Sequence, residues 1–243
     1  MGNTCFLNSV IQCLTYCPSF AQACLLREHS SQCRKPSNSC IACVMESHIV
    51  QYLSPESRSN GSVKPIGVLT NIKRISKTIA IGRQEDAHEF LRFLIDSMLY
   101  PKKNGHDTSV AAKYFKGCVV STITCSSCQK RSDKVDMMLD VSLDIKSSKS
   151  IEHSLGAFVG TEVLKGANKY ACETCKRLTD AKKQVTFKES PSTLTLHLKR
   201  FGFSKQTSKL NHFVQYGETL DLGPYMSNKT ATNETYELCG GSL

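Results

Sequence analysis

Two pairs of cysteines, each with two residues between its members, constrain this sequence more than any other feature. Cys125 and Cys128 form the first pair, and Cys172 and Cys175 form the second. One such pair brings two thiolates within reach of a single ion, and two pairs complete a tetrahedral zinc site with four thiolate ligands. Four protein ligands leave no open coordination position, so we expect a structural zinc. Buried free thiols or a redox pair are the alternative, which the presence of two pairs makes less favoured.

A second group of metal-ligand residue types lies in a polar segment nearer the N-terminus. It consists of His29, Cys33, Cys40 and Cys43. Imidazole and thiolate suit zinc, and the residues at 36–38 would let the chain turn between the ligands. The spacing is not one of the standard zinc patterns, and cysteine is abundant in this chain. Zinc and free thiols therefore both remain as interpretations.

The 13 cysteines also bear on the compartment. A secreted disulfide scaffold is usually shorter and begins with a signal peptide, whereas polar residues at 8, 12 and 15 interrupt the apolar residues here. No segment reaches the about 18 apolar residues of a membrane span. We expect an intracellular protein of the cytoplasm or nucleus, with reduced cysteines and no membrane partner. The net charge of +10 comes from scattered basic pairs, which favours a solvated surface over a nucleic-acid interface.

Hydrophobic periodicity divides the chain into a helical part and a later strand-rich part. Residues 6–17 and 85–98 carry apolar residues at helical spacing, with Pro18 ending the first pattern. The Ser/Pro/Gly/Asn stretch at 54–61 predicts a loop. Strict alternation at 139–145 and 194–199 predicts strands. Helices followed by strands indicate an α+β fold, with the change of period at about residue 115.

A candidate nucleophile lies at the start of the first predicted helix. Unpaired amides and the helix dipole stabilise a thiolate at such a position, and comparable settings lower a thiol pKa from about 8.5 toward about 3.5–7.5. Cys5 occupies it, and Asn3 or Thr4 could cap the helix. Taken alone, a cysteine at a helix start is more often an ordinary buried residue.

The sequence around Cys5 changes that interpretation. Residues 2–12 read Gly-Asn-Thr-Cys-Phe-Leu-Asn-Ser-Val-Ile-Gln, Gln84–Leu91 read Gln-Glu-Asp-Ala-His-Glu-Phe-Leu, and Leu194–Phe201 read Leu-Thr-Leu-His-Leu-Lys-Arg-Phe. With the two cysteine pairs between them, these segments resemble, in order, the motifs of the ubiquitin-specific proteases. The resemblance covers residues 2 to about 226.

This resemblance implies a papain-like fold with a helical thumb (1–110), fingers with the zinc ribbon (111–190) and an incomplete palm sheet (191–243). It also implies hydrolysis of the bond after the C-terminal glycine of ubiquitin, with Cys5 forming an acyl-enzyme. Asp86, Glu89 and Phe201 match positions that contact ubiquitin, the two acids facing arginines of its tail. A solvated helix face is the alternative for the acids, and strand-end core is the alternative for Phe201. The expected partners are ubiquitin and ubiquitinated proteins, bound by a monomer.

The match with the family is incomplete at both ends. The oxyanion asparagine of the family precedes the nucleophile by five residues, and the sequence starts four residues before Cys5. The catalytic histidine and its orienting Asp or Asn follow a strand like 236–238, where this sequence has Cys239–Leu243. His197 and His212 do not match the catalytic position. We therefore expect weak or no activity and an exposed sheet edge.

Two other classes of function compete with the deubiquitinase. A non-catalytic ubiquitin-binding module would keep Asp86 and Glu89 without a working triad. A zinc-ribbon nucleic-acid binder is suggested by the net charge of +10. That class is the least favoured, because the basic pairs lack interleaved aromatic residues on which bases could stack.

Overall fold

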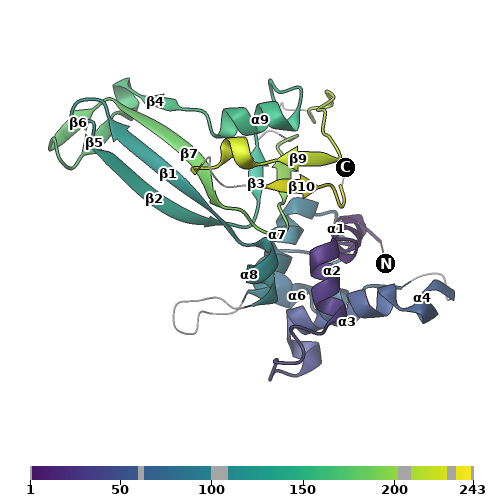
Figure 1. Ribbon diagram of the computed structural model, residues 1–243. Coiled ribbons are helices and arrows are strands. Elements are labelled where there is room, and N and C mark those ends of the chain that lie inside the picture. Colours follow the sequence, from purple (N-terminus) through teal and green to yellow (C-terminus); the bar gives the residue numbers. More distant parts are fainter. Residues whose placement is uncertain (1, 60–62, 100–108, 202–208, 229–233, 242–243) are drawn as a thin grey trace. The chain divides into compact units, whose positions relative to one another are not determined.

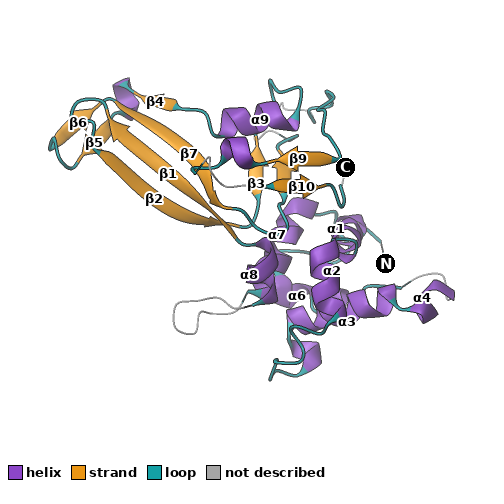
Figure 2. Cartoon of the chain, viewed as in Figure 1, coloured by secondary structure: helices purple, strands orange, loops and turns teal. Residues whose placement is uncertain are grey.

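The computed structural model describes residues 2–59, 63–99, 109–201, 209–228 and 234–241 (Figure 1). They fall into two compact units. The first comprises Met1–Lys116, Pro191–Thr193 and Cys239–Leu243, and the second comprises Gly117–Ser190 and Leu194–Leu238. The predicted α+β class is confirmed, since the first unit is helical and the second carries the strands (Figure 2).

The first unit is built from helices and short turns. Their bounds are α1 Cys5–Thr15, α2 Pro18–Leu25, the 3-10 turn η1 Ser37–Ser39, α3 Ile41–Leu53, α4 Pro55–Ser59, α5 Ile66–Thr70, α6 Ile72–Ile75, α7 Ala87–Met98 and α8 Val110–Phe115. Apolar residues of α1 and α7 at helical spacing are buried, as the periodicity predicts. Phe6 of α1 meets Phe90 of α7 edge to face, with ring centroids 5.4 Å apart.

Two local predictions for this unit are wrong. The helix expected over 6–17 ends at Thr15, and Pro18 begins α2 instead of only closing α1. Proline suits a first helical position because its missing N–H would have no partner there. The loop expected at 54–61 contains the short helix α4, whose first residue is Pro55 for the same reason. Residues 60–62 lie outside the described part of the chain.

The second unit contains a four-stranded antiparallel sheet with the order β2-β1-β7-β4. Its other strands pair as β3 with β8 in parallel, β5 with β6, and β9 with β10. The bounds are β1 Gly117–Cys125, β2 Arg131–Met138, β3 Val141–Leu143, α9 Ile151–Phe158, β4 Glu162–Leu164, η2 Gly166–Asn168, β5 Tyr170–Cys172, β6 Arg177–Thr179, β7 Ala181–Glu189, β8 Leu196–Leu198, β9 Thr219–Asp221, η3 Gly223–Tyr225 and β10 Thr235–Glu237.

The two segments predicted as strands from their alternating pattern pair with each other. Val141 lies opposite Leu196, and Leu143 lies opposite Leu198. Both strands are shorter than the alternating stretches, at three residues each. The buried face of β3 joins the core of this unit, which consists of Met138, Val141, Leu143, Leu155, Phe187, Leu222 and Met226. Among the described helices of either unit, none is both long and apolar enough to pass through a lipid bilayer.

Candidate functional site

Cys5 is the first residue of α1, and its side chain is exposed. The first amide groups of a helix have no acceptor within it, so they and the helix dipole favour negative charge at this position. Thr4 is the N-cap residue, but its side chain makes no capping hydrogen bond. Asn3 does not cap the helix either, because its φ is +59° and its Nδ2 donates to Gly82 O at 2.8 Å. The expected side-chain cap is thus absent at α1, which leaves the first amide groups of this helix available to an anion.

The bond from Asn3 to Gly82 brings the Cys5 segment and the start of α7 together within the first unit. Asp86 is the N-cap of α7, and its Oδ1 accepts from Glu89 N at 2.9 Å. Just before it, Glu85 Oε1 accepts from Ala80 N at 2.9 Å. Asp86 and Glu89 are both exposed. Capping explains the aspartate structurally and leaves its role toward ubiquitin a prediction.

Phe201 belongs to the second unit and follows β8. Its side chain is 66% exposed, so the interpretation of this residue as strand-end core is wrong. Lys209 Nζ lies 5.9 Å from the centroid of its ring, within range of a cation–π contact. An exposed aromatic ring is available for a partner, although contact with ubiquitin stays a prediction.

The two histidines that the sequence offers as an alternative base, His197 and His212, have partners elsewhere. His197 Nδ1 lies 3.0 Å from Ser142 Oγ, and His212 Nε2 lies 3.2 Å from Ser148 O, both within the second unit. His48 is buried in α3, where burial holds its pKa below the usual value. In the described part of the chain, no side chain is hydrogen-bonded to the Cys5 thiol.

The four ribbon cysteines converge in the second unit, with their sulfur atoms all within 4.8 Å of one another. Cys125 and Cys175 sulfurs are 3.9 Å apart, and Cys128 and Cys172 sulfurs are 3.7 Å apart. A tetrahedral ion with bonds of about 2.3 Å would hold its sulfur ligands about 3.8 Å apart. This ribbon cluster could therefore hold a metal.

The backbone around each cysteine pair turns in the same way. Gln129 and Lys176, each directly after the second cysteine of its pair, have φ of +57° and +54°. The two turns close through Gln129 N to Cys125 O at 3.0 Å and Lys176 N to Cys172 O at 2.9 Å. The Thr179 hydroxyl and nearby backbone amides lower the pKa of Cys125 to about 6, and Cys175 N donates to Cys172 Sγ at 3.4 Å. These donors favour the thiolate, which is the form that binds metal.

The second predicted group also converges, in the first unit. Ligand atoms of His29, Cys33, Cys40 and Cys43 all lie within 4.8 Å of one another. His29 Nε2 is 3.2 Å from Cys40 Sγ, and Cys40 is the N-cap of α3. Three of the four residues are buried, and Cys33 is half-buried. The His/Cys cluster that these four residues form could also hold a metal.

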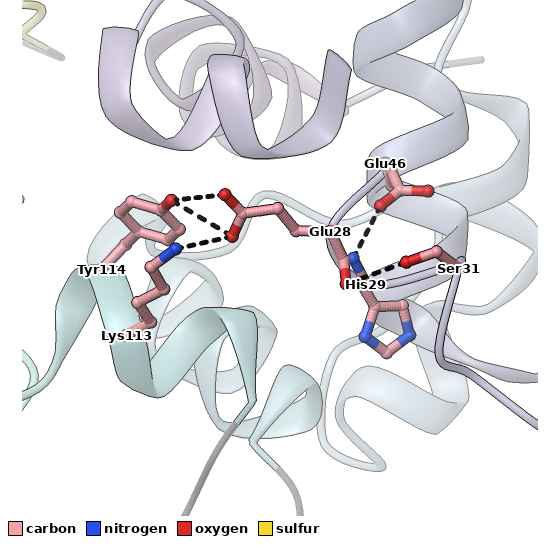
Figure 3. A network of polar contacts seen from close by, with 6 residues as sticks. All are labelled: Glu28, His29, Ser31, Glu46, Lys113 and Tyr114. Carbon is pink, nitrogen blue, oxygen red and sulfur yellow. Dashed lines mark hydrogen bonds and ion pairs between the residues drawn. The ribbon is translucent and has the colours of Figure 1, made fainter. Parts of the chain in front are cut away.

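A buried carboxylate beside this cluster was missed by sequence reasoning. Glu46 of α3 is 2% exposed, and its Oε2 accepts from His29 N at 3.2 Å (Figure 3). The same oxygen accepts from Ser30 N at 3.3 Å. The signal that could have found it is its spacing. Glu46 follows Cys43 by about one helical turn, so the carboxylate lies on the same face of the helix as a metal-ligand cysteine.

Comparison with known proteins identifies the family. The family model described as ubiquitin carboxyl-terminal hydrolase matches residues 1–242. The chain belongs to this family. The resemblance to the ubiquitin-specific proteases is thereby confirmed.

Members of this family match nearly the whole chain. It is 42% identical to a probable ubiquitin carboxyl-terminal hydrolase 16 of Schizosaccharomyces pombe, over 99% of this chain and 54% of that protein. It is 38% identical to the human ubiquitin carboxyl-terminal hydrolase 42, over 98% of this chain and 18% of that protein. The chain thus spans about half or less of these relatives.

A solved structure shows the same fold. It is the Ubp8 deubiquitinating module with Sgf11, Sus1 and Sgf73 bound to ubiquitin aldehyde. The TM-score is 0.79 at 33% identity, covering 93% of this chain and 52% of the matching chain. The fold of the ubiquitin-specific proteases that the sequence predicts is thus confirmed over 93% of this chain.

Proposed function

We propose that this chain is the nucleophile-bearing part of a cysteine deubiquitinase that acts on the bond after the C-terminal glycine of ubiquitin. The observation that carries the proposal is the exposed thiol of Cys5 at the first position of α1, in a chain of the ubiquitin carboxyl-terminal hydrolase family. A thiol in that position is accessible to a substrate carbonyl and faces the positive end of the helix dipole.

In the proposed reaction, the sulfur of Cys5 attacks the glycine carbonyl and the amine of the attached protein leaves with a proton. Water then hydrolyses the thioester and releases ubiquitin with a free carboxylate. Asp86 and Glu89 supply negative charge at the start of α7, beside the segment that carries Cys5, which suits arginines of the ubiquitin tail. Phe201 offers an exposed apolar surface to the same partner.

The rate of the 243-residue chain by itself depends on a base for Cys5. His197 and His212 are each bonded within the second unit, and neither is at the family's catalytic position. Loss of general base catalysis costs about 10²–10⁴-fold in rate. We propose that this chain alone turns over weakly. The same observation favours a second candidate, a ubiquitin-binding module without turnover.

The test uses the whole chain with two ubiquitin reagents, a fluorogenic C-terminal amide and ubiquitin with a C-terminal electrophile. We expect the electrophile to modify Cys5, with loss of modification in Cys5→Ala. Cys13→Ala is the matched control, because Cys13 lies on the same helix and burial raises its pKa.

Each outcome separates the candidates. Hydrolysis of the amide that Cys5→Ala abolishes would support an enzyme complete enough to turn over. Modification of Cys5 without hydrolysis would support the binding module. Absence of both modification and ubiquitin binding, in a folded chain, would contradict the proposal.

We further propose that both cysteine-containing clusters hold structural Zn2+. The ribbon cluster and the His/Cys cluster each offer four ligands, which leave no open position for chemistry. Binding of a structural zinc can contribute about 10–16 kcal/mol of apparent free energy at neutral pH. We expect two zinc ions per chain by elemental analysis, one lost in Cys172→Ser and the other in Cys40→Ser.

A further inference from the structure

Glu46 is a buried carboxylate whose contacts reach one proposed metal ligand and its neighbours. Carboxylates are almost never fully buried unless they are paired. Its Oε2 accepts from the backbone N–H of His29 (Figure 3) and from that of Ser30. Its Oε1 lies 3.6 Å from Arg27 Nη1 without a hydrogen bond. These partners all lie in the short segment 27–30, which follows α2.

Besides Glu46, this segment is held by Glu28, whose carboxylate binds Lys113 and Tyr114 of α8. Among residues 25–39, all of which the structure describes, His29 alone is buried. The end of α2 is closed by Arg27 N to Cys24 O and Glu28 N to Ala23 O, each at 3.1 Å. This motif places Arg27 at φ +56°, a conformation that glycine adopts without strain. The ion pair with Glu46 offsets the strain of an arginine at this φ.

The geometry connects two sides of the His/Cys cluster. His29 comes from the segment after α2, whereas Cys40 and Cys43 lie at the start of α3. Glu46 stands about one turn further along α3 and bonds to the main chain of His29 itself. The carboxylate thus fixes the distance between the histidine and the cysteine pair, which a tetrahedral ion requires to be constant.

We infer that Glu46 is the positioning residue of a zinc centre at His29, Cys33, Cys40 and Cys43. From α3, its carboxylate binds the main chain of His29 and holds the imidazole at the distance from the cysteines that the metal requires. The inference rests on the zinc centre proposed above for this cluster. Removal of a residue that is hydrogen-bonded to a metal ligand typically lowers the metal affinity about 10–100-fold.

Glu28 provides a matched control, because it is also next to His29 and also charged. Its carboxylate turns away from the cluster and binds α8, with Lys113 Nζ at 2.8 Å and Tyr114 Oη at 3.1 Å (Figure 3). A general effect of negative charge near the metal would weaken binding equally in Glu28→Gln and Glu46→Gln. A positioning effect belongs to Glu46 alone.

The experiment is a zinc competition titration of the whole chain against a chromophoric chelator, with the ribbon site as the internal reference. In Glu46→Gln we expect the affinity of the Cys40-dependent site to fall about 10–100-fold, with the Cys172-dependent site unchanged. Glu28→Gln should leave both affinities unchanged. Co2+ bound at the Cys40-dependent site should give a shifted visible spectrum in Glu46→Gln, which a change in stability alone would not produce.

Arg27→Gly is the second variant in case Glu46→Gln does not fold. Glycine accepts the positive φ at residue 27, and the two amide bonds to Glu46 remain available. We expect a smaller loss of affinity at the same site. Two bound zinc ions with unchanged affinity in both variants would overturn the role of Glu46. Zinc binding that Cys40→Ser does not reduce would instead overturn the metal centre itself.

Discussion

The two candidate metal clusters meet the same chemical requirement by different means. In the ribbon, local backbone turns with positive φ at Gln129 and Lys176 aim each cysteine pair, and amide groups donate to the sulfur atoms. In the first unit, the start of α3 supplies two cysteines, and a carboxylate three residues beyond the second one holds the histidine. The ribbon cluster thus depends on backbone conformation, whereas the His/Cys cluster depends on a side chain.

The largest expected effect that separates them is the loss of a ribbon ligand. Cys172→Ser should release one zinc and unfold the β5–β6 hairpin, because its apolar side chains find little cover there. Leu178, for example, is 64% exposed. Zinc contributes about 10–16 kcal/mol of apparent binding free energy in such sites. Elemental analysis and limited proteolysis around residues 165–180 would measure the change.

Cys118→Ser is the matched control for this ribbon variant. Cys118 lies on β1, the strand that ends at Cys125, and outside the cluster. It should keep two zinc ions and resist the protease as the unchanged chain does. Protection of the hairpin in Cys172→Ser would show that the ribbon folds without its metal.

A smaller effect is expected for Cys40→Ser in the helical unit. One zinc should be lost, yet the helices should persist, because a core independent of the cluster joins α1, α3 and α7. Fully buried members of that core are Leu7, Met45, Ile49, Phe90 and Leu94. We expect unchanged far-ultraviolet circular dichroism and faster cleavage confined to residues 27–40.

The control for Cys40→Ser is Cys13→Ser, on a half-buried position of α1 that the cluster does not include. If Cys40→Ser abolished the helical signal altogether, the two clusters would be equally necessary for folding. The contrast between them would then be wrong.

The sequence predicts ligands better than it predicts what holds them. All eight metal-ligand candidates were identifiable from residue type, and six of them form three C-x-x-C pairs, which are a local pattern. The bonds from Glu46 to His29 and from Asn3 to Gly82 join residues 17 and 79 positions apart, which no local pattern encodes. Positive φ at Arg27 escaped prediction for a related reason, since arginine rarely occupies a position suited to glycine.

Glycine substitutions at positive φ give the smallest expected effect and the sharpest comparison. Lys176→Gly in the ribbon should raise stability by about 1 kcal/mol, because a side chain at left-handed φ costs about 1–2 kcal/mol and glycine avoids part of it. Arg27→Gly relieves the same strain, but it leaves the buried Glu46 without the guanidinium at 3.6 Å. Loss of the cation beside a buried carboxylate costs more than the strain recovered, even with the two amide bonds kept, so this variant should lose stability.

Denaturant titration of the zinc-loaded chain, with one probe in each unit, measures both changes. At residue 176 the turn around the metal needs a positive φ, and no hydrogen bond or ion pair of the lysine side chain to a described residue is lost in Lys176→Gly. At residue 27 the arginine has an unfavourable φ but places its charge near Glu46, and Arg27→Gly removes that charge. Opposite signs would mean that the ribbon is organised by its backbone and the helical cluster by its ion pair. A gain in both would mean that Arg27 contributes nothing to Glu46, and the carboxylate would then hold His29 through its amide bonds alone.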